Sequence, residues 1–319
     1  MLGTIMAISS TNWLYVWMGL ELNLLSFIPL MSKTNNLQET ESTVKYFITQ
    51  ATGSGLLLLS AFTMNSHQLS IINPLAFNTF MMMSLFLKLG AAPMHWWLPQ
   101  VMAGLPWLNC LILTTWQKIA PLCLLLTTMS PHTNKLPLMM CMLGAVVGGV
   151  GGMNQSHLRT MLAYSSIGHL AWMLTALMII SSSMLIIYFM VYSTINLMIM
   201  SSMHFASQLH STMNQSIMNT SHITFMSLTI LLFSLGGLPP LLGFTPKWLM
   251  LISLTNKTMF TPLFFLISGS LLNLFYYLSM TFNFLLSSYS KRLTAPQVPT
   301  YMMPLTMIMG GLSSLIVIM

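Results

Sequence analysis

Apolar residues run through this chain in stretches of about 20 residues, the length that an α-helix needs to cross the hydrocarbon core of a bilayer. Short polar segments separate the stretches, the longest being 32–45, 207–222 and 287–300. The pattern predicts spans near 1–10, 13–31, 46–64, 74–103, 107–128, 137–153, 161–180, 184–206, 223–254, 259–286 and 301–319. We therefore expect an all-α polytopic membrane protein of about 11 transmembrane helices, the first of them truncated, without a separate soluble domain.

Glycine and proline interrupt two of these spans, at KLGAAPMHWWLP (88–99) and at GGLPPLLGFTPKW (236–248). Proline removes a backbone donor and clashes with the preceding turn, so we expect each run to break its helix. Unwound backbone at membrane depth is tolerated only inside protein or beside a water-filled cavity. The alternative is a pair of ordinary proline kinks. The residues predicted to form the breaks are Gly90, Pro93, Gly236, Gly237, Pro239, Pro240 and Pro246.

Each break falls in the fourth span of a block of five, which suggests an internal repeat. Residues 1–128 would form the first block, truncated at its N-terminus, and 137–286 the second. An odd number of spans reverses the second copy, so the two blocks are predicted to be inverted repeats, followed by a C-terminal helix at 301–319. Matched broken helices in the two halves of a chain are a sequence signature of a transport site.

The composition excludes several classes of protein. Hydrophobic residues make up 55% of the chain and charged residues only 4%. The net charge of +7 reflects missing acids, because the sequence has no Asp and only Glu21, Glu39 and Glu41. Its ten Lys and Arg residues are scattered, which argues against nucleic-acid binding. Three cysteines are too few for the four thiolates of an iron–sulfur cluster, and we expect no metal or redox cofactor on this chain.

Glu21, Lys88, Lys118 and Lys247 lie within or at breaks of the apolar spans. An ionisable group in hydrocarbon costs about 2.5–3.5 kcal/mol on insertion scales, so such groups indicate function by default. The alternative for the lysines is a cation that snorkels or merely stabilises its helix. We favour a proton path, because an ammonium in a low-dielectric interior gives up its proton far more readily than one in water.

The sequence also predicts where these charges sit. Lys88 ends the first half of a broken span, where the helix dipole favours a cation. Lys247 follows Pro246 at the start of a half-helix, where the dipole is unfavourable, and Lys118 is expected in mid-span. Unit charges about 4 Å apart interact by roughly 4 kcal/mol at an effective dielectric constant near 20. A small movement of Glu21 relative to Lys88 would then decide whether Lys88 keeps its proton.

Other polar residues are weaker candidates. His169, in SSIGHLAWM (165–173), is a possible relay, although a lone membrane histidine is more often a hydrogen-bonded packing residue. Glu39 and Glu41 are expected to be solvated in the most charged loop. Gly144, Gly148 and Gly152 recur every four residues, which predicts a face for close helix packing.

The distribution of Lys and Arg in the loops predicts the orientation. One face holds Lys33, Lys45, Arg159, Lys291 and Arg292, and the other holds Lys135 and Lys257. The first face is therefore expected inside, towards a mitochondrial matrix or a bacterial cytoplasm.

Several runs together resemble one family: GLELN (19–23), KYFITQA (45–51), KLGAAPMHWWLP, TWQKIAPL (115–122), GGVGGMNQSHLR (148–159), AYSSIGHLAWM (163–173) and GGLPPLLGFTPKW. The chain is similar, over nearly its whole length, to NADH dehydrogenase subunit 2, the antiporter-like membrane-arm subunits of mitochondrial respiratory complex I. It looks like an animal form, without the three N-terminal helices of bacterial relatives. Relative to the family it starts half a helix late, so we expect further residues upstream.

The resemblance implies a site and a setting. Glu21 resembles the channel glutamate, Lys88 its partner, Lys118 the central lysine and Lys247 the exit-side lysine, while His169 matches a histidine near the hydrophilic axis. The family lies in the mitochondrial inner membrane and binds no redox cofactor, although the whole complex uses NADH, FMN, iron–sulfur clusters and ubiquinone. Other membrane-arm subunits and inner-membrane lipids such as cardiolipin are the implied partners.

Two other functions use the same features. A stand-alone cation/proton antiporter would also need buried lysines and broken helices. Sodium coordination favours Asp or paired carboxylates, and a single intramembrane acid, Glu21, favours protons instead. A passive scaffold, whose buried charges only hold helices together, is the third possibility.

Overall fold

A computed structural model describes residues 1–32, 36–65, 74–128, 135–179, 181–209 and 222–289, and these residues form helices and connecting turns without β-strands. The predicted C-terminal helix at 301–319 and the loop cations Lys33, Lys291 and Arg292 lie outside the described residues. The helices are α1 (Leu2–Ser9), α2 (Trp13–Met31), α3 (Leu37–Asn65), α4 (Pro74–Leu89), α5 (Trp97–Gly104), α6 (Trp107–Thr114), α7 (Trp116–Thr128), α8 (Lys135–Met153), α9 (Leu158–Ile179), α10 (Ser182–Leu209), α12 (His222–Gly236), α13 (Phe244–Asn256) and α14 (Phe260–Tyr289).

The all-helical membrane fold predicted from the sequence is confirmed for the described part. Six stretches are long and apolar enough to cross a membrane, namely α2, α6 with α7, α8, α9, α10 and α14. Shorter apolar helices, Phe77–Leu89 and Ser227–Gly236, precede the two Gly/Pro runs. The total of about 11 spans stays a prediction.

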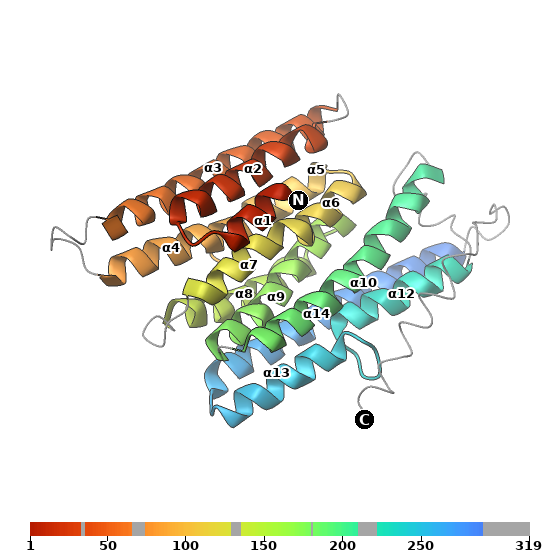
Figure 1. Ribbon diagram of the computed structural model, residues 1–319. Coiled ribbons are helices and arrows are strands. Elements are labelled where there is room, and N and C mark those ends of the chain that lie inside the picture. Colours follow the sequence, from red (N-terminus) through yellow and green to blue (C-terminus); the bar gives the residue numbers. More distant parts are fainter. Residues whose placement is uncertain (33–35, 66–73, 129–134, 180, 210–221, 290–319) are drawn as a thin grey trace.

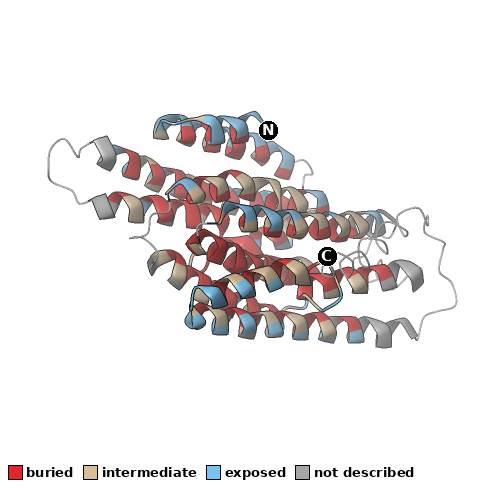
Figure 2. Cartoon of the chain, turned by 60° about the horizontal axis from the view of Figure 1, so that its bottom comes forward, coloured by how far each residue is buried: buried red, intermediate tan, exposed pale blue. Residues whose placement is uncertain are grey.

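The helices lie side by side in one bundle, with α1–α4 at one side, α10–α14 at the other and α7–α9 between them (Figure 1). Helix α9 is the centre of this arrangement, because it packs against α5, α8, α10, α13 and α14. Its apolar stretch is 89% buried, against 28% for that of α14. Exposed residues lie on the outer faces of peripheral helices such as α1 (Figure 2). A helix that is apolar all round is expected in such a central position.

Buried hydroxyls do not disturb α9, because they bond to its own backbone. Ser165, Ser166 and Thr175 donate to the carbonyls of Leu162, Ala163 and Trp172 at 2.9, 2.8 and 2.6 Å. Local bonding of this kind satisfies the hydroxyl donor without a partner from another helix. The hydroxyl side chains of α9 can therefore lie against neighbouring helices at a low cost in free energy.

Helices α8 and α9 approach closely at the glycine face of α8. A Cβ atom at Gly148 would lie 2.7 Å from the backbone nitrogen of Gly168, and one at Gly144 would lie 3.1 Å from the Cβ of Ala171. Gly152 faces α14 instead, where a Cβ would lie 2.6 Å from the ring of Tyr276. The small residues thus allow the backbone of α8 to pack directly against α9.

Replacing Gly148 with leucine should prevent this packing. The new side chain meets the backbone of Gly168, which cannot move aside as a flexible side chain could, and overpacking in a core costs about 1–3 kcal/mol or more. We expect little folded protein in the membrane fraction, measured by immunoblotting. Gly55→Leu is the matched control, because a Cβ at Gly55 has no neighbour within 4 Å. Equal recovery of the two variants would contradict the close α8–α9 contact.

The two Gly/Pro runs end their helices in the same way. Gly90 follows α4 with φ 72°, and Gly237 follows α12 with φ 81°. The next amide closes the turn in each case, from Ala91 to the carbonyl of Phe86 at 3.0 Å and from Leu238 to that of Phe233 at 3.3 Å. Both are Schellman caps, which need a residue with positive φ and so favour glycine.

A cis X–Pro bond follows three residues after each of these glycines, at Ala92–Pro93 and at Pro239–Pro240. The chain resumes as α5 and α13. Two residues assigned to the breaks lie inside helices instead: Gly236 is the last residue of α12, and Pro246 is in the first turn of α13. Proline is tolerated in a first turn because the amide there has no intrahelical partner.

The sequence did not predict a third interruption, at Thr115 between α6 and α7. The Thr115 hydroxyl donates to the carbonyl of Leu111 at 2.7 Å, a type of bond that bends helices. The amide of Lys118 bonds to the carbonyl of Thr115 at 3.2 Å, so α7 starts with a tight turn. Lys118 therefore lies in the first turn of α7, and it still stands in the middle of the apolar span Trp107–Thr128, as the sequence predicts.

Candidate functional site

Lys88 lies in the last turn of α4, as the sequence predicts, and is 8% exposed. Gly53 of α3 lies against its aliphatic chain, where a Cβ would be 3.1 Å from the lysine Cγ. Side chains from α3 and α5 donate to carbonyls at the end of α4. Gln50 Nε2 donates to the carbonyl of Lys88 at 3.2 Å, and Trp97 Nε1 donates to that of Leu87 at 3.1 Å.

Glu21 of α2 is half-buried, and its Oε2 atom has no hydrogen-bond partner. Its charge acts on Lys88, but within the described residues neither side chain belongs to a close ion pair. The acid therefore faces the lysine without contacting it. Their interaction varies with the inverse of the separation, so a movement of either group changes it.

Lys88 and Lys118 line the same cavity, which has about 20 Å³ of space for the centres of water molecules. That volume is enough for an ordered water where the lining is polar. Asn23, Gln50 and Gln117 supply polar side chains from three helices. The remaining lining residues are Leu20, Leu24, Tyr46, Leu89, Trp97, Leu98, Leu113 and Pro121.

Lys118 is 2% exposed and has only neutral partners in the described structure. Its Nζ donates to the carbonyl of Ser166 in α9 at 3.4 Å and lies 5.3 Å from the centre of the Tyr192 ring of α10. A ring face attracts an ammonium electrostatically, most strongly where water is excluded. Lys118 thus links the cavity on one side to α9 and α10 on the other.

The charges of both Lys118 and Lys247 act on His169. It is 5% exposed, and its Nδ1 is 3.0 Å from the hydroxyl of Tyr188. Its ring centre is 5.1 Å from that of Tyr192, the tyrosine that also contacts Lys118. The Nε2 atom is buried without a hydrogen-bond partner, so one ring nitrogen is oriented and the other is unoccupied.

The position of Lys247 differs from the expectation. It belongs to the first turn of α13, but its side chain extends back to the end of α12, where Nζ donates to the carbonyls of Leu235 and Gly236 at 3.2 and 2.7 Å. These carbonyls form the negative end of the α12 dipole, which favours a cation. The prediction of an unfavourable dipole was therefore wrong. The sequence position of a lysine shows which helix holds its Cα atom, but not which helix end its ammonium reaches.

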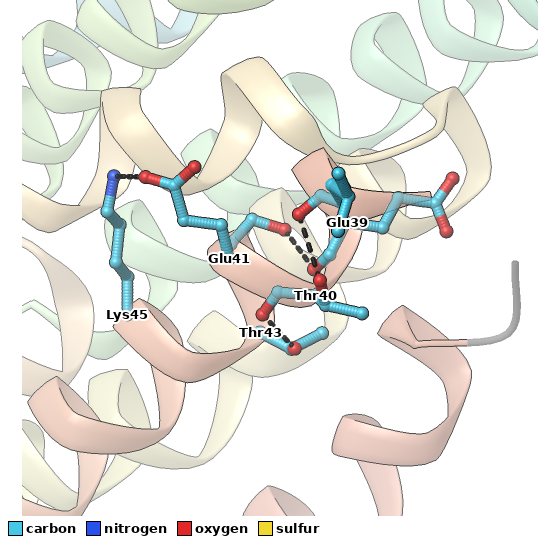
Figure 3. A network of polar contacts seen from close by, with 7 residues as sticks. Glu39, Thr40, Glu41, Thr43 and Lys45 are labelled. Carbon is cyan, nitrogen blue, oxygen red and sulfur yellow. Dashed lines mark hydrogen bonds and ion pairs between the residues drawn. The ribbon is translucent and has the colours of Figure 1, made fainter. Parts of the chain in front are cut away.

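The two acids that were expected in a loop, Glu39 and Glu41, lie at the start of α3 and differ from each other. Glu41 is exposed and forms an ion pair of 2.6 Å with Lys45, which lowers the pKa of its carboxyl (Figure 3). Glu39 points away from this pair and is only 7% exposed, so its expected solvation was wrong (Figure 3). Asn36 Nδ2 donates to its Oε1 at 3.5 Å. Asn at the N-cap with Glu three residues later is a capping pattern, a signal in the sequence for this inward position.

Sequence reasoning missed the buried tyrosines. Tyr188, Tyr192, Tyr276 and Tyr277 are each at most 3% exposed. The sequence did carry a signal for them. Membrane tyrosines are most common at the ends of spans, whereas these lie within apolar spans. In the part of the chain that the structure describes, no three His, Cys, Asp or Glu residues lie close enough to bind a metal ion.

The bundle, its paired helix breaks and its buried lysines define an antiporter-like membrane subunit. The family model of the membrane domain of NADH:quinone oxidoreductase and Mrp antiporters matches residues 10–275. A respiratory complex I structure from Thermus thermophilus has a similar fold, with a TM-score of 0.81, 22% identity and coverage of 98% of this chain and 75% of that chain. A structure of an Mrp complex from Dietzia sp. has a TM-score of 0.76 at 14% identity, covering 93% and 60%.

Sequence relatives narrow this class further. NADH-ubiquinone oxidoreductase chain 2 of Lumbricus terrestris is 44% identical over 281 residues, which are 88% of this chain and 82% of that protein. The protein of the same name from Bos taurus is 40% identical over 294 residues, covering 89% and 82%. The chain belongs to the NADH-ubiquinone oxidoreductase chain 2 family.

Proposed function

We propose that Glu21, Lys88, Lys118, His169 and Lys247 form a proton path through this chain. The observation that carries the proposal is their continuity. Lys88 and Lys118 line one cavity, and the charges of Lys118 and Lys247 both act on His169. Ionisable groups enclosed in a membrane bundle mark ion pathways and proton relays.

The chain is a membrane-arm subunit of the proton-pumping NADH:quinone oxidoreductase, as its family membership indicates. Its animal relatives are mitochondrial, so its setting is the mitochondrial inner membrane and its partners are other subunits of that complex. We assign NADH, FMN, the iron–sulfur clusters and ubiquinone to those partners, and no redox cofactor to this chain. Inner-membrane lipids such as cardiolipin are the proposed contacts of its exposed apolar faces.

Two lysines of the path, Lys118 and Lys247, have neutral partners that tolerate loss of the lysine proton. Lys118 and Lys247 bond to backbone carbonyls and an aromatic ring, so deprotonation leaves no unpaired anion beside them. Two ammonium groups around one cavity repel each other, since unit charges about 8 Å apart interact by roughly 2 kcal/mol at an effective dielectric near 20. A proton arriving at Lys88 therefore drives one from Lys118 towards His169.

We also propose that residues 1–128 and 137–286 are inverted repeats. The matched caps at Gly90 and Gly237, each followed three residues later by a proline, support this division. A stand-alone antiporter is less well supported, because curated relatives at 40–44% identity are named as chain 2 of NADH-ubiquinone oxidoreductase. The scaffold alternative gives no reason for a small cavity with polar lining between two lysines.

Replacing Glu21 with glutamine tests the start of the path. The variant removes the only negative charge that acts on Lys88 within the described structure, while keeping the shape of the side chain. We expect the pH dependence of NADH:quinone turnover by the assembled complex to shift. The pH dependence of proton uptake into proteoliposomes should shift with it. The control Glu41→Gln removes an exposed acid paired with Lys45 and should leave the profile unchanged. Superimposable profiles for the wild type and Glu21→Gln would exclude this pair from the mechanism.

A further inference from the structure

Arg159 binds the far end of α5, the half-helix that follows the first Gly/Pro break. It lies in the first turn of α9, and its Nη1 atom donates to the carbonyls of Leu105 and Ala103 at 2.6 and 3.3 Å. These carbonyls stand at the C-terminus of α5, where the last backbone acceptors of a helix have no intrahelical donor. The guanidinium thus attaches α9 to the negative end of the α5 dipole, which favours a cation.

Neighbouring helices hold this attachment in place. The Cζ atom of Arg159 lies 5.2 Å from the centre of the Trp107 ring, which is 3% exposed in the first turn of α6. The charge of Glu39, in the first turn of α3, also acts on Arg159. Gly104 ends α5 against α3, because a Cβ there would lie 2.7 Å from the carbonyl oxygen of Gln38. The C-terminal end of α5 is therefore fixed between α3 and α9.

The other end of α5 forms part of the lysine cavity. Trp97 is its first residue, and its Nε1 donates to the carbonyl of Leu87 at 3.1 Å, directly before Lys88. Trp97 and Leu98 both line the cavity that Lys88 shares with Lys118. Helix α5 has eight residues and is therefore about 12 Å long. A displacement of its C-terminal end is transmitted along this short helix to the wall of the cavity.

Helix α9 positions the second lysine of this cavity as well. Lys118 donates to the carbonyl of Ser166 at 3.4 Å, and Ser166 lies about two turns along α9 from Arg159. A single helix therefore holds the acceptor for Lys118 and, through α5, the wall beside Lys88.

We infer that Arg159 is a positioning residue of the proton path, which fixes α5 and with it the wall of the cavity between Lys88 and Lys118. The inference rests on the proposed path and adds to it a residue that carries no transferred proton, since arginine is not deprotonated in proteins. The cavity has about 20 Å³ of space for the centres of water molecules, so it has room for little more than one ordered water. A misplacement of about 1 Å can slow a reaction by about 10²-fold. The position of α5 therefore controls transfer between the two lysines.

Replacing Arg159 with methionine tests the inference in the assembled complex. The variant keeps an unbranched side chain but loses the donor to α5 and the charge. We expect coupled NADH:quinone turnover and proton uptake into proteoliposomes to fall several-fold. Arg159→Lys keeps a cation and a donor at the end of α5, so it should retain more of both activities. Lys45→Met is the control, because Lys45 is a cation of α3 that is 41% exposed and paired with Glu41, and its loss should leave both near the wild-type level.

A double-mutant cycle distinguishes positioning through α5 from a general structural effect. Trp97→Phe removes the bond to the carbonyl of Leu87 while keeping an aromatic ring at the cavity. Independent effects multiply in a double variant, whereas effects that pass through one link do not. We expect Arg159→Met/Trp97→Phe to lose no more turnover than the more affected single variant. A map of the Arg159→Met complex supplies a second measurement, in which Trp97 Nε1 should lie farther from the carbonyl oxygen of Leu87.

The outcomes separate this inference from the proposed path. A loss in each single variant, no larger loss in the double variant and a displaced α5 support it. Wild-type turnover in either single variant, multiplied losses in the double variant, or an undisplaced α5 overturns it. If neither Arg159→Met nor Arg159→Lys assembles, Arg159 stabilises the whole fold and the inference is also overturned. The path itself is judged by Lys118→Met: full pumping in that variant overturns the path, whatever the Arg159 variants do.

Discussion

Replacing Lys118 with methionine should remove most proton pumping while the complex still assembles. Methionine has a volume similar to that of lysine and is apolar, so it suits a site that is 2% exposed. The helices should therefore keep their packing. The variant loses the group that joins the cavity to His169. Positioned proton-transfer groups contribute 10²- to 10⁴-fold, so we expect coupled NADH:quinone turnover and proton uptake to fall by roughly tenfold or more. Both are measured in proteoliposomes that contain the complex.

The control for this variant is Lys257→Met. Lys257 is exposed and bonds to a single carbonyl at the end of α9, so its loss should leave pumping near the wild-type level. A scaffold role for Lys118 predicts a different result, in which assembly fails before pumping does. An assembled Lys118→Met complex that pumps at the full rate would rule out the relay.

Replacing Gly237 with alanine should uncouple Lys247 from its carbonyl partners. The new Cβ would lie 2.8 Å from both Cδ and Nζ of Lys247, so the ammonium is pushed away from Leu235 and Gly236. The residue also keeps a φ of 81°, which costs a residue with a Cβ about 1–2 kcal/mol. We expect a several-fold loss of pumping together with a modest loss of thermal stability of the isolated complex.

Gly90→Ala separates the two effects. Gly90 has a φ of 72° and so carries a similar backbone cost, but its Cβ would meet the Cδ1 atom of Leu98 at 2.9 Å, the end of a flexible apolar side chain. We expect comparable thermal destabilisation with much less loss of pumping per assembled complex. If both variants lose pumping equally, the position of the Lys247 ammonium is not the cause.

The sequence predicted the helical membrane fold because hydrophobic length and the glycine–proline runs are local signals. It also located Lys88 at a helix end, since that residue directly precedes the glycine that caps α4. It could not locate the ammonium of Lys247, because the side chain crosses a helix break and finds its partners 11 and 12 residues upstream. Which way a long side chain extends depends on how the two half-helices meet, and no local pattern encodes that.

Two other features depend on contacts between distant segments. The interruption at Thr115 has no glycine or proline at the residue itself, and a hydroxyl bond to Leu111 is its only visible cause in the described structure. The buried tyrosines lie on α10 and α14, which are far apart along the chain. Each tyrosine alone reads as an ordinary apolar residue of its span. Only the packed bundle brings their hydroxyl groups together.

The sequence has no acid beyond Glu41, so the half of the bundle that holds Lys247 carries no carboxylate. The ammonium there rests on two neutral carbonyl oxygens alone. Among the described residues no acidic side chain belongs to this half, so a second positive charge that approaches repels the first. On the proposed path, a second positive charge that reaches this half of the bundle should therefore displace the proton held by Lys247.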